Sequence, residues 1–240
     1  MNKTWTRIVI VVIAAAAVAF WVFFDRQRAP ERQMDNVLNE MPAWQVIKEQ
    51  EPVLHQRILD QMAALQKAGE PEQQIIDTIQ PQILHLQMTR LQNAPDANVV
   101  NYMTINMEQT AAIQKVSDDA CFRFLYPMVK GGINPMRMLD KDLMTRRMQA
   151  DADMMRAAYG KNRHTVTPEE REAAVTDVRP IMKTLADKYG EDIQLLQMPE
   201  KAAGKEKLSC DMVQEMWAKV LALPEQKAAG VIRLAVSELE

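Results

Sequence analysis

The chain has 240 residues, of which 29 are Lys or Arg and 32 are Asp or Glu, giving a formal net charge of −3 at pH 7. Nucleic-acid binding needs a basic surface that neutralises phosphates, so this charge balance argues against a nucleic-acid partner. Glycine is rare at seven residues and aromatic residues make up 5%. Because Ala, Leu, Met and Gln are abundant helix formers, we expect an all-α fold.

The N-terminal region contains an apolar run, Ile8 to Phe24, of seventeen residues without a charged side chain. A helix of this length spans ~25 Å, slightly less than the ~30 Å hydrocarbon core of a bilayer. Trp5 and Trp21 lie near its two ends, where indole rings suit the membrane interfaces. We therefore expect residues 1–24 to form a signal-anchor with a single transmembrane helix.

The alternative to a retained anchor is a signal peptide cleaved after Ala19, because the residues at 17–19 (Ala-Val-Ala) match the small-x-small cleavage pattern. Cleavage would leave five large apolar residues, 20–24, at the new N-terminus, and retention is therefore favoured. The basic leader with Lys3 and Arg7 resembles an export signal. It predicts a cytoplasmic N-terminus and an exported body, which in a double-membraned bacterium means inner membrane and periplasm.

The remaining chain divides into a polar juxtamembrane stalk, 25–41, and a helical extracytoplasmic domain, 42–240, with a sub-boundary at the loop-like stretch 160–167. Its apolar spacing predicts an irregular bundle of seven or eight helices. In chain order these cover 43–50, 52–68, 71–92, 96–125, 135–159, 168–189, 208–223 and 224–240, with Pro81 expected to kink or split the third.

Several helix ends are marked by specific residues. Gly69 is expected to end one helix, and Asp96 to cap the helix that follows a break at Asn93 to Asp96. Thr167 and Pro168, followed by two glutamates, predict another helix start.

The two cysteines, Cys121 and Cys210, predict one disulfide if the body faces an oxidising space. The bond would close a loop of 89 residues and stabilise the fold by ~4–5 kcal/mol in the chain-entropy model. Two buried free thiols are the alternative, and the absence of a Cys-x-x-Cys pair argues against a redox motif. The aromatic stretch that begins at Cys121 and ends at Tyr126 is expected at the centre of the core.

Arg123 is the one unusual charge, because it lies inside this otherwise apolar stretch. A buried arginine needs a partner. We expect a structural ion pair with Asp119, one helical turn earlier.

Catalytic and metal-binding patterns are weak. The histidines, His55, His85 and His164, do not form an i,i+4 pair, and no Gly-x-Ser-x-Gly is present. We therefore expect neither catalytic residues nor a cofactor. The chain has eighteen methionines, and pairs four apart, such as Met212 and Met216, could bind Cu(I) or form an adaptable partner surface, but this spacing is also typical of a buried helix face.

These observations predict a membrane-anchored, non-enzymatic protein that binds another envelope protein in an accessory, assembly or scaffold role. Two alternatives stay open: an inhibitor or immunity-type protein that neutralises a secreted effector, and a small-ligand or copper-binding helical domain. Self-association through Ala15 and Ala19 is a weaker expectation, based on small residues four apart in the apolar run.

Overall fold

A computed structural model describes residue 35 and residues 38–237 of the chain. The expected anchor, Ile8 to Phe24, and most of the expected stalk lie outside the described residues. Within the described part, no helix is both long enough and apolar enough to cross a membrane.

The described residues form an all-helical bundle, and no strand occurs among them. The elements are α3 (Pro42–Gln50), α4 (Pro52–Ala68), α5 (Glu72–Asn93), α6 (Asp96–Val116), α7 (Asp118–Leu125), α8 (Pro127–Lys130), η1 (Pro135–Arg137), α9 (Lys141–Tyr159), α10 (Pro168–Tyr189), η2 (Gly190–Leu196), η3 (Pro199–Lys201), α11 (Glu206–Leu221) and α12 (Glu225–Ser237).

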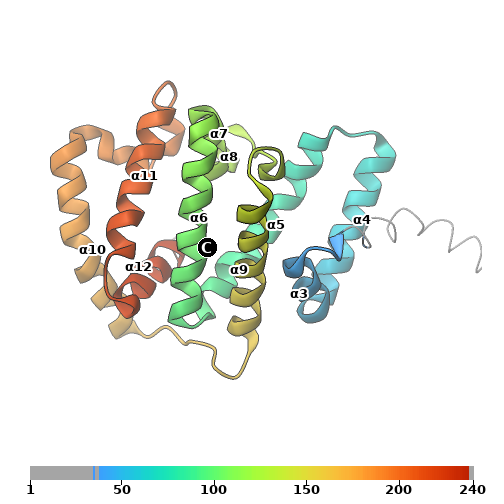
Figure 1. The fold of residues 1–240 in the computed structure, drawn as a ribbon, viewed down its shortest axis with the longest axis horizontal. Helices are drawn as coiled ribbons and strands as arrows, with labels where there is room; N and C mark the ends of the chain where they lie inside the picture. Colours follow the sequence, from blue (N-terminus) through green and yellow to red (C-terminus); the bar gives the residue numbers. More distant parts are fainter. Residues whose placement is uncertain (1–34, 36–37, 238–240) are drawn as a thin grey trace, which may run out of the picture.

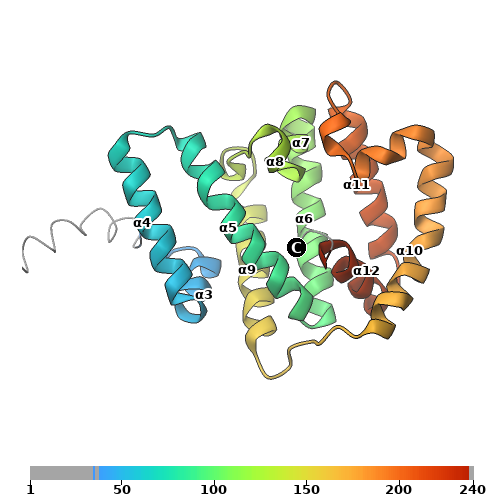
Figure 2. The same cartoon turned by 180° about the vertical axis from the view of Figure 1, so that it is seen from behind.

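Helix α6 lies in the middle of the molecule (Figure 1) and packs against α7, α9, α11 and α12. Helices α10, α11 and α12 lie on one side of it. Helices α5 and α9 lie on the other side, followed by α3 and α4 at the far end, and the view from behind agrees (Figure 2). Helix α10 and the α3–α4 pair therefore occupy opposite ends of the longest axis.

One main hydrophobic core draws on helices from both sides of the 160–167 loop. Its fully buried members include Val46, Ile58, Leu91, Val99, Ala152, Met154, Leu185, Val220 and Ile232. A second, smaller cluster surrounds the cysteines and contains Ile113, Phe122, Leu195 and Met212. The aromatic stretch after Cys121 thus belongs mainly to this second cluster and is not the centre of the main core.

The predicted helix ends at Gly69 and Thr167 are confirmed. Gly69 ends α4 in the left-handed region, with φ 74°, which a residue with a Cβ adopts only at a cost. The Thr167 hydroxyl accepts a hydrogen bond of 3.2 Å from the Glu170 amide at the start of α10. Helix α10 then continues to Tyr189, as its apolar spacing predicts.

Several predicted boundaries differ in the structure. The predicted helix 135–159 is a short 3-10 turn at Pro135–Arg137 followed by α9 from Lys141. Helix α5 continues through Pro81, so the expected split does not occur. The predicted helix 96–125 is interrupted at Ser117, whose hydroxyl accepts from the Ala120 amide at 3.2 Å and starts α7. Asp96 is the first residue of α6 and not its cap.

Asp96 instead pairs with Arg233, a buried arginine on α12 that is only 2% exposed. The Arg233 Nη2 atom lies 2.7 Å from Asp96 Oδ1, and it also donates to the Ala94 carbonyl at 2.6 Å. The Nη1 atom lies 3.0 Å from Glu170 Oε1 on α10. One guanidinium therefore joins α12, α10 and the turn between α5 and α6.

Replacing Arg233 with methionine is expected to lower the free energy of unfolding by about 3 kcal/mol. Methionine replaces only the aliphatic part of the arginine, so two carboxylates lose their counter-charge and the Ala94 carbonyl loses its donor. The effect lies at the lower end for a broken buried pair because Asp96 and Glu170 retain some water contact, with side chains 28% and 22% exposed. Thermal unfolding of the full chain in detergent should show Tm lower by roughly 6–12 °C. The matched variant Arg179→Met, on the exposed face of α10, should change stability by less than ~0.5 kcal/mol. Equal losses in the two variants would contradict a structural role for Arg233.

Candidate functional site

The two cysteines meet at disulfide distance, as predicted. Cys121 on α7 and Cys210 on α11 have Cα atoms 6.4 Å apart, and both are fully buried. The pair joins two helices that are 89 residues apart in the chain. Because neither sulfur is open to solvent, the pair fits a structural bond better than a reactive one.

Arg123 and Asp119 have partners other than each other. The Arg123 side chain donates from Nε to the Gly131 carbonyl at 3.2 Å and from Nη2 to the Gly132 carbonyl at 2.7 Å. Asp119 accepts from Lys130 Nζ at 2.6 Å. The turn at Gly131, with φ 77°, folds back over Arg123, and its carbonyls occupy the positions that a carboxylate was expected to fill.

Two of the histidines have carboxylate partners. His55 is buried on α4 and its Nε2 lies 2.9 Å from Asp35 Oδ1. His164, in the 160–167 loop, places Nε2 2.6 Å from Glu170 Oε2, whereas His85 is exposed on α5. Among residues 35 and 38–237, no group of three or more His, Cys, Asp or Glu side chains is arranged to hold a metal ion.

Asp35 is the acceptor for three side chains. Its carboxylate accepts hydrogen bonds from Trp44 Nε1 at 3.1 Å and from Lys48 Nζ, in addition to the His55 contact. Burial alone would raise the pKa of Asp35, but these donors outweigh it and lower the pKa to about 2. This ionised carboxylate therefore links the start of the described body to α3 and α4.

A buried polar network fills the contact between α6 and α9. Arg147 donates from Nε to Asp151 at 2.8 Å and from Nη1 to Gln109 at 3.3 Å. Its guanidinium carbon lies 4.5 Å from the centre of the Tyr102 ring, and burial raises the pKa of that tyrosine. Because these groups satisfy each other away from solvent, they act in holding α6 to α9.

The methionine pairs lie mostly on inward faces. Met212 is fully buried and Met103 is 6% exposed, while Met216 and Met107 are partly buried against the main core. These thioethers therefore fill the interior between helices.

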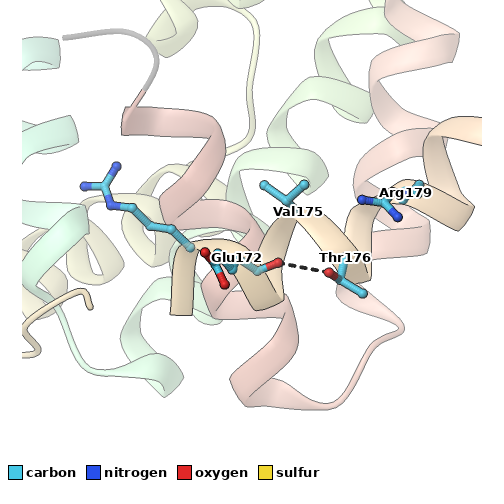
Figure 3. Close-up of a pocket in the computed structure, with 5 residues that line it drawn as sticks. Glu172, Val175, Thr176 and Arg179 are labelled. Atoms are coloured by element: carbon cyan, nitrogen blue, oxygen red, sulfur yellow. Dashed lines mark hydrogen bonds between the residues drawn. The ribbon is translucent and has the colours of Figure 1, made fainter. Parts of the chain in front are cut away.

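The candidate functional site is a shallow groove on the outward face of α10, called here the α10 groove. Figure 3 shows four of its residues labelled, with Val175 and Arg179 on one side of the helix. The Thr176 hydroxyl donates to the Glu172 carbonyl at 3.0 Å. The groove is lined by Arg171, Glu172, Val175, Thr176 and Arg179. Val175 is 44% exposed, so an apolar side chain lies open to solvent between two arginines.

The two arginines of the α10 groove differ from most other charges of this helix, which have ion-pair partners. Lys183 pairs with Asp187 at 2.7 Å, and Asp177 pairs with Lys227 at 2.7 Å. Within the described residues, the side chains of Arg171 and Arg179 have no ion-pair or hydrogen-bond partner. Two positive charges on one exposed surface are therefore available to pair with another molecule.

The chemistry of the α10 groove comes from the side chains that line it. It combines two guanidinium donors, one carboxylate, one hydroxyl and an exposed apolar side chain.

Comparisons of the chain with protein-family models, with curated proteins and with solved structures found no match. The residues of this chain are therefore the basis of the function proposed below.

Some of the residues in these contacts have a signal in the sequence that the predictions above did not use. Arg171, Val175 and Arg179 recur every four residues, which places them on one helix face. Arg233 interrupts the apolar residues Ile232 and Leu234, and a charge inside such a run indicates a buried partner. Nothing in the local sequence of Asp35 indicates its three donors.

Replacing Asp35 with asparagine is expected to reduce the free energy of unfolding by about 2 kcal/mol at neutral pH. The folded-state pKa of about 2 lies below the ordinary 3.8. The stabilisation is therefore complete above the ordinary pKa and is lost as pH falls from there towards the folded value. Urea unfolding of the full chain and the Asp35→Asn variant should converge over this window. Asp60→Asn, on the exposed side of α4, serves as the control, and a stability difference that persists unchanged to the lowest pH would contradict the assignment.

Proposed function

We propose that this protein is a membrane-anchored, non-enzymatic binding protein that holds another envelope protein in an accessory, assembly or scaffold role. The contact surface is the α10 groove, with Arg171 and Arg179 as its charged edges. The anchor is the apolar run Ile8 to Phe24.

The proposed compartment is the inner membrane, with the N-terminus in the cytoplasm and the helical body in the periplasm. The basic leader before the apolar run supports this orientation. The buried Cys121 and Cys210 pair also supports it, because structural disulfides persist in oxidising compartments. In the reducing cytoplasm, two cysteines at bonding distance would stay free thiols and would not link α7 to α11.

The observation that carries the binding proposal is the unpaired charge of the α10 groove. Charges at the helix contacts are used within the fold: Arg233 by Asp96 and Glu170, and Arg147 by Asp151. The groove arginines are not used in this way and flank an exposed valine. Protein interfaces have an apolar core and a polar rim, and arginine is enriched among the residues that dominate binding.

The position of the α10 groove also suits a membrane-held body. Helix α10 lies at the end of the molecule opposite α3 and α4, where the described helices begin (Figure 1). A body attached through its N-terminal end would present α10 at its free end. A partner could then reach the groove without displacing the anchor.

Site-specific photo-crosslinking in intact cells tests this proposal. The photoreactive residue p-benzoylphenylalanine replaces Thr176 in the α10 groove of the full chain, and in a matched chain it replaces Gln66 on exposed α4. We expect a protein adduct from position 176 and none from position 66, because only the first side chain lies in the contact surface.

Both chains must accumulate in the membrane fraction, which immunoblotting checks. A chain that is membrane-bound but yields no adduct from position 176 would overturn the proposal. So would equal adducts from the two positions, or an adduct with twice the mass of the chain itself.

A further inference from the structure

The shape of the α10 groove follows from helix geometry. Side chains four apart form ridges along a helix, and a groove lies between neighbouring ridges. Arg171, Val175 and Arg179 form one such row, and Glu172 and Thr176 form the next. A partner helix can place one row of its own side chains into this groove, which is the commonest way that helices pack.

The middle of the α10 groove permits close approach. Val175 and Thr176 are short β-branched side chains at its centre, and the neighbouring Ala173 and Pro180 are also exposed on α10. The middle of the groove is therefore lined by shorter side chains than its ends. The long arginines lie on both sides of it, eight residues or ~12 Å apart along the helix axis.

We propose that the α10 groove receives an acidic amphipathic helix of the partner, with carboxylates on both sides of a central apolar residue. The inference rests on the proposed function and specifies the chemistry of the partner. The apolar residue packs on Val175, and the flanking carboxylates pair with Arg171 and Arg179. Each guanidinium offers a fork of donors that a carboxylate can accept from in pairs.

Glu172 restricts the register in which the partner helix can bind. It lines the second row of the groove beside Thr176, so a partner carboxylate placed there would be repelled. Carboxylates are therefore favoured opposite one row and disfavoured opposite the other, and this combination of attraction and repulsion produces specificity. A bare anionic membrane surface would approach both rows at once and meet Glu172 as well as Glu169, the latter exposed at the start of the same helix.

The ion pairs would govern selection of the partner more than the strength of binding. Exposed pairs contribute little to affinity but guide encounter and exclude wrong partners. Removing both charges should therefore reduce complex formation severalfold, and reversing them should reduce it further. The packing on Val175 supplies the remaining contact.

Charge reversal in the photo-crosslinking chain tests the inference. With p-benzoylphenylalanine at position 176, the double substitution Arg171→Glu and Arg179→Glu should lower the adduct yield at least about fivefold. Arg171→Lys with Arg179→Lys keeps both charges and should keep most of the adduct. The control Arg57→Glu with Lys67→Glu makes the same change in net charge on exposed α4 and should leave the yield unchanged.

Mass spectrometry of the adduct gives a second readout. The crosslinked partner peptide should carry Asp or Glu within two helical turns on both sides of the attachment point. A peptide with basic flanks, or an adduct with the mass of a lipid, would overturn the inference. An undiminished adduct after charge reversal would also overturn the inference, but it would leave the proposed function intact. The proposed function fails if the chain with both arginines gives no adduct.

Discussion

The buried guanidinium of Arg233 is the contact on which the arrangement of the helices depends. It reaches Asp96 at the start of α6, Glu170 on α10 and the Ala94 carbonyl in the turn between α5 and α6. Glu170 also contacts His164 in the loop before α10. A charge at 2% exposure is tolerated only when such partners are supplied. Because α6 is the central helix, fixing its first turn against α10 and α12 fixes the two halves of the bundle relative to each other. Arg147 on α9 and the pair of Cys121 with Cys210 hold α6 and α7 farther along.

Local sequence signals predicted the helices well, whereas contacts between distant residues stayed hidden. Gly69 and Thr167 act through backbone conformation and short-range hydrogen bonds, so their roles could be read directly from the chain. The cysteine pairing followed from there being two cysteines. Arg123 was assigned to Asp119 because they are one turn apart, but the folded turn at Gly131 brought carbonyls closer than that carboxylate. Partners such as Arg233 and Asp96 are set by tertiary packing, which periodicity does not encode. The α10 groove was missed because its arginines look like ordinary surface charges until the pairing of their neighbours is known.

The proposal separates charged side chains that are paired within the bundle from charged side chains that bind a partner. Other charged side chains are paired within the bundle, as Arg147 with Asp151 on α9 and Lys227 on α12 with Asp177 on α10 illustrate. In the proposal, Arg171 and Arg179 bind the outside partner, and they lie on the helix farthest from α3 and α4 (Figure 1). In the proposed arrangement, the apolar run at the N-terminus restricts the body to the membrane surface, which raises the local concentration of any partner held there. A modest contact on α10 can then be sufficient for a stable assembly.

Arginine footprinting with phenylglyoxal tests the central claim, occupation of the α10 groove by a partner, most directly, because it needs no substitution and no knowledge of the partner. The full chain is labelled in native membranes and again after purification in detergent, and labelled arginines are quantified by mass spectrometry. Arg57, exposed on α4, reports equal access to reagent in both samples. The account predicts that Arg171 and Arg179 are shielded in native membranes and become reactive on purification, while Arg57 reacts equally in both. Equal reactivity of all three arginines in the two samples would contradict it.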